Sequence, residues 1–232
     1  MRLEQLLFSQ GFGTRQACRA LAAAGRVAID GRGEVDPERE LAIGDGAPFA
    51  VDGVPWPYWP RAVVVLHKPA GFECSAAPRD HPPVVSLLPQ PLRRRGTQPV
   101  GRLDADTTGV LLLTDDGALL HRLTSPKRKV EKVYEVTLRH PLHDAQLAAL
   151  VDGVVLRDDV EPVRARRAER TAERRLRLVL ESGKYHQVKR MLAAVGNRVE
   201  SLHRSRFAGI GAEGLAPGAW RWLAADERAS LG

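Results

Sequence analysis

The segment Gly101–Gly109 constrains the fold of this chain more than any other part of its sequence. It reads Gly-Arg-Leu-Asp-Ala-Asp-Thr-Thr-Gly, and the apolar run Val110–Leu113 follows it directly. Arg102, Asp104 and Asp106 stand at alternate positions, so an extended backbone would turn all three side chains to one face. Charges beside a buried segment cost free energy unless ion-pair partners or a substrate meet them. The segment therefore predicts a functional site, with its two aspartates as the first candidates for chemistry.

The composition is compatible with a polyanionic partner but does not require one. The 232 residues suffice for one large domain or for a small domain plus a mid-sized one. A content of 44% hydrophobic and 27% charged residues is typical of a soluble globular protein. The formal charge of +7 suits the phosphates of a nucleic acid, although a GC-rich genome that uses arginine as ordinary surface charge explains it equally well.

Neither a membrane protein nor a secreted protein is predicted. No apolar run approaches the ~20 residues of a bilayer-spanning helix, and the N-terminus becomes charged again too early for a signal peptide. Cys18 and Cys74 form neither a disulfide framework nor a metal-binding pair. We therefore expect reduced thiols, a cytoplasmic location and no membrane partner.

Residues 1–54 are predicted to form a small separate α+β domain. The apolar residues before Gly11 are spaced for one face of a short helix. Thr14 stands at the N-cap position of a second helix, over residues 15–24. A short strand and a turn follow at residues 26–31. Two helices and a hairpin of this size bury only a marginal core.

This unit resembles the alpha-L motif, a small RNA-binding module named after a ribosomal small-subunit protein. The shared pattern is Gly-x-x-Thr-Arg-x-x-Cys at Gly11–Cys18, then Gly-x-Val and Asp-Gly at residues 25–31. Arg15 and Arg19 lie four residues apart and so share a helix face. In that family the second helix and the following turn face RNA, which implies RNA binding by Arg15, Gln16, Arg19 and Arg26. A solvated basic helix is the alternative.

Residues 55–61 are interpreted as a semi-stiff linker, because their three prolines cannot continue a helix or a central strand. Residues 62–232 are predicted to form a larger α+β domain with a mostly antiparallel sheet. Its predicted strands are Val63–Leu66, Val133–Leu138 and a hairpin of Arg164–Arg170 with Arg174–Leu180. Helices are predicted at about 143–151 and 185–195, and a long surface loop with little regular structure at 74–99.

Three segments of the larger domain, 101–109, 125–136 and 181–192, occur in an order and at separations that resemble the pseudouridine synthases. The likeness is greatest to the branch that modifies ribosomal RNA and carries an N-terminal alpha-L module. It extends over essentially the whole chain, including His67–Pro69, Cys74-Ser75 with Asp80–Pro82, and Leu215–Gly218. Each motif alone is weak, whereas the ordered set is specific.

The resemblance implies roles for individual residues. It makes Asp104 the catalytic aspartate and places Tyr134 beneath the flipped base. The usual arginine partner of the aspartate falls on Lys189, which supplies a positive charge but no two-pronged contact, and the adjacent Arg190 is left as a sharer of this task. Arg102 would fill the space that the flipped uridine leaves in the RNA. Asp106 is interpreted as part of the turn and is left out of the catalytic set.

Simpler interpretations stand beside these roles. On an alternating strand Tyr134 is more often a core residue, and Lys189 with Arg190 also reads as an exposed basic helical turn. His186 reads as a satisfied histidine at a helix N-terminus. Basic residues near the motifs are expected to contact rRNA phosphates, which positions the RNA without reading its sequence; they are Lys127, Arg128, Lys129, Arg93–Arg95, Arg204 and Arg206, with Arg190 also assigned to RNA binding.

The resemblance thus implies an rRNA pseudouridine synthase that needs no cofactor and no metal, acts as a monomer, and binds ribosomal RNA or an assembly particle. The 16S enzyme is the nearest match, and a 23S enzyme of the same branch is the alternative. A non-catalytic RNA-binding ribosome-assembly factor is a second hypothesis. A glycoside hydrolase using Asp104 and Asp106 is disfavoured, because residues two apart on one strand face lie roughly 6.5–7 Å apart and point the same way.

Overall fold

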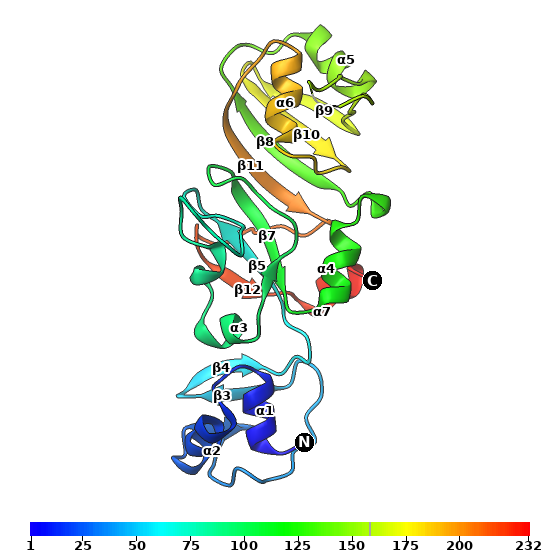
Figure 1. The fold of residues 1–232 in the computed structure, drawn as a ribbon. Coiled ribbons are helices and arrows are strands. Elements are labelled where there is room, and N and C mark those ends of the chain that lie inside the picture. Colours follow the sequence, from blue (N-terminus) through cyan, green and yellow to red (C-terminus); the bar gives the residue numbers. More distant parts are fainter. Residues whose placement is uncertain (158) are drawn as a thin grey trace. The chain divides into compact units, whose positions relative to one another are not determined.

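The chain divides into two units in a computed structural model, which describes residues 1–157 and 159–232 (Figure 1). The first unit is assembled from residues 1–62, 85–98 and 114–116. The second comprises residues 63–84, 99–113 and 117–232. The first unit therefore takes in two short segments that the sequence interpretation had assigned to the larger domain.

The first unit joins two helices to a four-stranded antiparallel sheet with strand order β2-β1-β3-β4. The helices α1 and α2 lie where they were predicted, and the Thr14 hydroxyl accepts a hydrogen bond from the Ala17 amide at 3.2 Å, which confirms the predicted N-cap. The elements are α1 (Leu3–Ser9), α2 (Arg15–Ala23), β1 (Val27–Ile29), β2 (Arg32–Glu34), β3 (Pro48–Val51) and β4 (Val54–Pro57).

Strand β4 occupies part of the segment interpreted as a linker. Pro55 and Pro57 pair with β3, and Trp56 between them is buried. Phe12 packs edge-on against the Trp56 ring, with centroids 5.2 Å apart. The linker interpretation is therefore wrong for residues 55–57. Strand β4 ends its sheet, and an edge strand tolerates prolines because only one of its sides must supply ladder hydrogen bonds.

The predicted loop at 74–99 also contains regular structure, namely the 3₁₀ turn η1 (Val84–Leu87), the helix α3 (Gln90–Arg94) and the short strand β6 (Gln98–Pro99). A proline in the first turn of α3 is compatible with a helix start. The expectation that Arg95 contacts RNA phosphates is wrong, because its guanidinium is buried. It binds Asp115 at 2.6 Å, Gln10 at 2.7 Å and the Trp59 carbonyl at 2.9 Å. This segment therefore contributes to the interior of the first unit.

The second unit is built on a sheet with strand order β12-β5-β7-β11-β8-β10-β9, and β6 pairs β7 beside it. The pairing of β7 with β11 is parallel, while four other pairings are antiparallel, which confirms the predicted α+β class with a mostly antiparallel sheet. The strands are β5 (Val63–Lys68), β6 (Gln98–Pro99), β7 (Thr108–Thr114), β8 (Lys132–Leu138), β9 (Arg167–Ala172), β10 (Arg175–Leu180), β11 (Val199–Phe207) and β12 (Trp220–Trp222).

Helices of the second unit include both of those predicted from the sequence, as α5 and α6. Helix α6 buries Val188, Met191 and Leu192 along one side, and α5 packs on β9. These elements are α4 (Gly117–Thr124), η2 (Pro126–Arg128), α5 (Asp144–Asp152), α6 (Gln187–Ala194) and α7 (Ala225–Ser230).

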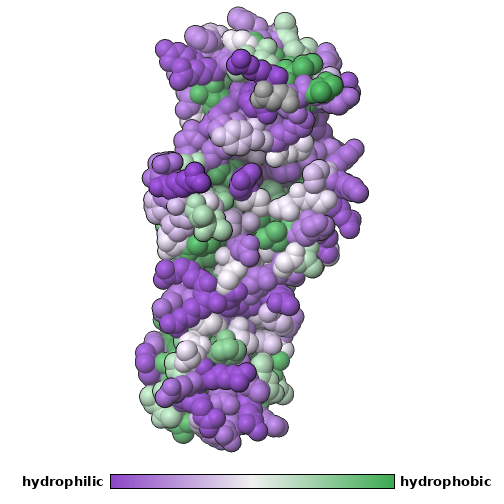
Figure 2. Space-filling view, viewed as in Figure 1, coloured by the Kyte–Doolittle hydropathy of each residue, from purple (hydrophilic) through white to green (hydrophobic). Residues whose placement is uncertain are grey.

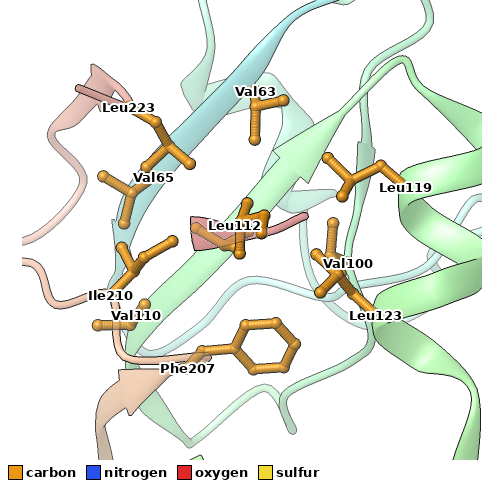
Figure 3. Packing of buried hydrophobic residues seen from close by; sticks show 11 residues of the cluster. Val63, Val65, Val100, Val110, Leu112, Leu119, Leu123, Phe207, Ile210 and Leu223 are labelled. Atoms are coloured by element: carbon orange, nitrogen blue, oxygen red, sulfur yellow. The ribbon is translucent and has the colours of Figure 1, made fainter. Parts of the chain in front are cut away.

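An apolar cluster beneath β5 and β7 forms a core of the second unit (Figure 3). Val63 and Val65 from β5, Leu112 from β7, and Phe207 at the end of β11 point into it. Gly109 lets β11 approach β7 closely, because a Cβ at this position would lie 2.8 Å from the Arg204 backbone nitrogen. The pairing of β7 with β11 therefore explains why the segment Gly101–Gly109 ends in glycine.

Hydrophilic residues dominate the face of the molecule in Figure 2. Within the part of the chain that the structure describes, no helix is both long and apolar enough to cross a membrane. Cys18 and Cys74 are both buried free thiols.

Candidate active site

The segment Gly101–Thr107 forms an irregular loop with a turn at Ala105-Asp106, and regular strand structure begins only at Thr108. The condition of an extended strand is therefore not met over Arg102, Asp104 and Asp106. The Thr107 amide donates a hydrogen bond to the Asp104 carbonyl at 3.1 Å, which closes the turn. Asp104 is consequently the first residue of this turn and Asp106 its third.

Lys68, at the end of β5, holds this loop from inside the protein. Its side chain is fully buried, and its ammonium donates hydrogen bonds to the carbonyls of Asp104, Ala105 and Thr107 at 3.1, 3.2 and 2.9 Å, and to Pro69 at 3.0 Å. Burial lowers the pKa of Lys68, whereas the carboxylates of the loop act in the opposite direction. The sequence signal for this role was a lysine at the end of an apolar strand, which must find acceptors once it is buried.

Lys189, on α6, joins both aspartates of the loop. Its amine lies 3.0 Å from Asp104 Oδ2 and 2.8 Å from Asp106 Oδ1. The Asp104 side chain is 27% exposed and that of Asp106 72%, so Asp104 is the one turned toward the protein. Burial opposes the charge of Lys189, but the two carboxylates outweigh it and raise the pKa of its amine. The pKa of Asp106 is lowered by Lys189 against the opposing effect of burial.

Two points of the sequence interpretation change at this cluster. Asp106 was assigned only to the turn, yet its carboxylate also binds Lys189. Arg190 was left as a second partner of Asp104, yet its guanidinium lies 3.4 Å from Asp159 and donates to the Tyr185 carbonyl. Consecutive helical residues point about 100° apart, so only one of the two neighbours turns toward the loop.

His186 adds a group that the sequence interpretation had set aside as a satisfied helix-terminal histidine. It precedes α6 in a left-handed conformation, with φ of +46°, and its Nε2 lies 3.4 Å from Asp104 Oδ1. The Tyr185 ring, 70% exposed, stacks on the His186 ring with centroids 3.8 Å apart. An exposed aromatic surface therefore adjoins the aspartate.

A small cavity of about 70 Å³ brings the predicted catalytic residues together. Asp104, Tyr134 and Lys189 line it, with Arg102 and Thr107 beside them. Tyr134 is 9% exposed on β8, so it both packs in the interior and faces the cavity. The Thr107 hydroxyl is buried and has no hydrogen-bond partner among residues 1–157 and 159–232. The arrangement combines a carboxylate, a cation and an aromatic ring, which suits a planar, polar ligand.

The residues predicted to bind RNA have varied surroundings. In the first unit, Arg19 forms ion pairs with Glu4 at 3.0 Å and Glu38 at 2.8 Å, and Arg26 binds Asp52 through two bonds of 2.6 Å. The Arg15 guanidinium instead lies over the Phe8 ring, and Gln16 is exposed on α2. The predicted RNA contacts stay predictions, but two of these arginines already have carboxylate partners.

In the second unit, Lys127 and Arg128 are exposed on η2. Arg206 binds Glu213 at 2.7 Å, and Arg204 is buried rather than exposed on the surface; a phosphate contact of either residue stays a prediction. The position of Arg204 on β11, between β7 and β8, takes it into the interior. No group of three or more histidine, cysteine, aspartate or glutamate residues within the described ranges is placed to hold a metal ion.

Comparison with known proteins identifies the family. The family model for RNA pseudouridylate synthase matches residues 62–194, more than half of the chain, and the match includes Asp104, Tyr134 and Lys189. The chain belongs to this family. It is an RNA pseudouridine synthase, as the ordered motifs implied.

Curated relatives share this assignment over their full length. A protein of Yersinia pestis named ribosomal small subunit pseudouridine synthase A is 42% identical, and the alignment covers all of this chain and 98% of the relative. The protein of the same name from Escherichia coli K12 is 39% identical, with full coverage of both chains. A crystal structure of a pseudouridylate synthase matches with a TM-score of 0.71 at 32% identity, covering both chains completely.

Proposed function

We propose that this synthase converts one uridine of 16S ribosomal RNA into pseudouridine, without a cofactor, and that Asp104 is its catalytic residue. The small-subunit names of the relatives at 39–42% identity support the choice of RNA. The observation that carries the assignment of Asp104 is that its carboxylate and Tyr134 line one cavity while the Lys189 amine lies 3.0 Å from that carboxylate.

The reaction breaks the bond between uracil and ribose, turns the base, and rejoins it to the same ribose through a carbon. No atom is gained or lost. A carboxylate held beside the ribose and base is a competent nucleophile or electrostatic partner for this step. Asp104 supplies it, and Lys189 orients it through a charge-assisted hydrogen bond.

The base must leave the RNA stack to reach Asp104, which costs a few kcal/mol. In the proposal, Tyr134 stacks on the extruded base, and Arg102, exposed at the rim of the cavity, fills the gap in the RNA. The exposed basic residues Lys127 and Arg128 bind phosphates and position the strand. The substrate is free rRNA or an assembly particle, and the enzyme acts as a monomer.

Asp104→Asn tests the catalytic assignment. We expect it to abolish pseudouridine formation in 16S rRNA transcripts, because the amide is neither charged nor nucleophilic, while RNA affinity stays nearly unchanged. Asp106→Asn is the matched control, and it should retain turnover because Asp104 keeps its contact with Lys189. Full activity of Asp104→Asn would refute the assignment.

Mapping pseudouridines across both rRNAs in a strain that lacks the protein tests the substrate. One missing position in 16S rRNA is expected. A missing position in 23S rRNA would instead favour a large-subunit enzyme, and unchanged maps would favour a non-catalytic assembly factor.

A further inference from the structure

A second cavity, of about 280 Å³, adjoins the catalytic one in the same unit. Arg102 and Tyr134 line both cavities, so a nucleotide in one would extend into the other. Leu123 and Phe207 give it an apolar wall that belongs to the core shown in Figure 3. Lys132 and Arg204 supply two cations to this apolar surface.

Arg204 has an unused donor at this cavity. Its side chain is 2% exposed, its Nε donates to the Val110 carbonyl at 2.9 Å, and its guanidinium lies 4.8 Å above the Phe207 ring. Its Nη2 is buried without a hydrogen-bond partner in the described part of the chain. A buried guanidinium donor without an acceptor is costly, and a ligand oxygen would remove that cost.

Lys132 brings a second cation with a free donor. Its amine donates to the Val130 carbonyl at 2.6 Å and the Glu181 carbonyl at 3.3 Å, which leaves one of three N–H groups for a ligand. Burial, strengthened by the charge of Arg204, lowers the pKa of Lys132 to about 8, with Glu181 acting in the opposite direction. A negative ligand beside this amine would stabilise its charged form.

The other charged groups that line the cavity do not neutralise this pair. The Glu181 carboxylate, the one carboxylate in its described lining, forms an ion pair with Arg166. Lys184 binds Asp159, and Arg102 adds a further exposed positive charge. The cavity thus has an excess of positive charge beside the catalytic aspartate.

We propose that this cavity binds a backbone phosphate of the RNA strand at the flipped uridine, with Lys132 and Arg204 as its ligands. The inference rests on the proposed function, since it assigns the cavity to the substrate of the neighbouring site. Charge-assisted hydrogen bonds to phosphate oxygens use both free donors, and the apolar wall of Leu123 and Phe207 accommodates the ribose. Tyr134, shared by the two cavities, connects the base position to the phosphate position.

Binding of uridine 5′-monophosphate and of uridine to the full-length protein tests the phosphate site. The monophosphate should bind about tenfold more tightly than uridine. Lys132→Met should remove this advantage and leave uridine binding unchanged. Arg175→Met, which removes an exposed positive charge far along β10, should leave both affinities unchanged. Uridine 3′-monophosphate in place of the 5′ isomer identifies which flanking phosphate is bound.

A pH series adds a readout that a structural role of Lys132 would not produce. Affinity for the monophosphate should fall between pH 7 and 9 in the wild type, because the free amine loses its proton near pH 8, and should be flat in Lys132→Met. The proposal would be overturned if uridine and both monophosphates bound with equal affinity. It would also be overturned if none of the three bound at millimolar concentration. These assays measure binding and need no turnover, so a missing phosphate preference refutes the phosphate site and not the proposed function. An absence of rRNA modification would instead refute the proposed function.

Discussion

The Lys189 amine contacts two carboxylates, and these contacts make the stability of the protein depend on pH. Its contacts with Asp104 and Asp106 raise the pKa of Lys189 and lower that of Asp106. A lowered aspartate pKa adds stability that is present above the unfolded value of about 3.9 and is lost as pH falls through the folded value. A raised lysine pKa adds stability that is present below about 10.4 and is lost as pH rises through the folded value.

Lys189→Met should therefore reduce stability by a nearly constant amount between about pH 4 and pH 10, and by less outside this window. Thermal unfolding across this range measures the difference. The same variant should lower kcat strongly and raise the pKa of Asp106 in a carboxyl ¹³C titration, whereas Lys189→Arg should keep both near the wild-type values. A pH-independent difference in stability would show that the ion pairs do not contribute.

Gly109 illustrates a backbone requirement of the motif. Its φ is +110°, and an added Cβ would meet the backbone of Arg204 on β11. Gly109→Ala should therefore lower the free energy of unfolding by more than about 1 kcal/mol. Gly117→Ala is the control, because Gly117 begins a helix, has open space around it and should tolerate alanine or gain slightly. Denaturant unfolding that ranks the two variants equally would contradict this account.

At the level of secondary-structure elements, the sequence predicted those features that depend only on residues close together in the chain. The N-cap at Thr14 and the alternation of β8 are visible in one dimension, and both were confirmed. The turn within Gly101–Thr107 could not be predicted, because the carbonyls of this loop are held by Lys68, more than thirty residues away. The burial of Arg204 likewise depends on the pairing of β11 with β7, which no local pattern reveals.

Lys68→Met should loosen this loop without changing its sequence. Each buried carbonyl left without a donor costs roughly 1–3 kcal/mol, so unfolding free energy should fall by about 3 kcal/mol. Amide exchange at Thr107 should accelerate, and kcat should fall more than KM rises, because Lys68 positions Asp104 without facing the cavity. Arg175→Met should change none of these quantities. Unaltered exchange at Thr107 in Lys68→Met would show that the loop is held by other contacts.

For the molecule as a whole, net charge overstates the charge available to RNA. The chain has 35 lysine and arginine residues against 28 acidic ones, and many of the arginines are paired within the protein. The ordered motifs predicted that Asp104, Tyr134 and Lys189 would belong to one site, and they line one cavity. Which arginines remain unpaired could not be predicted, since pairing joins residues such as Arg26 and Asp52 that are remote in sequence.

If the first unit binds RNA, as the alpha-L resemblance predicts, its binding should depend on unpaired arginines. Arg15 lies over Phe8, and no carboxylate contacts it in the described part of the chain. If Arg15 binds a phosphate, Arg15→Gln should lower rRNA affinity and reduce the slope of log K against log salt by roughly 0.7–0.9, as expected for one lost counterion contact. The double variant Arg26→Gln/Asp52→Asn removes an ion pair at constant net charge and should leave the slope unchanged, because Asp52 already neutralises Arg26. Filter-binding titrations at several salt concentrations separate these outcomes, and an unchanged slope in Arg15→Gln would remove Arg15 from the RNA-binding surface.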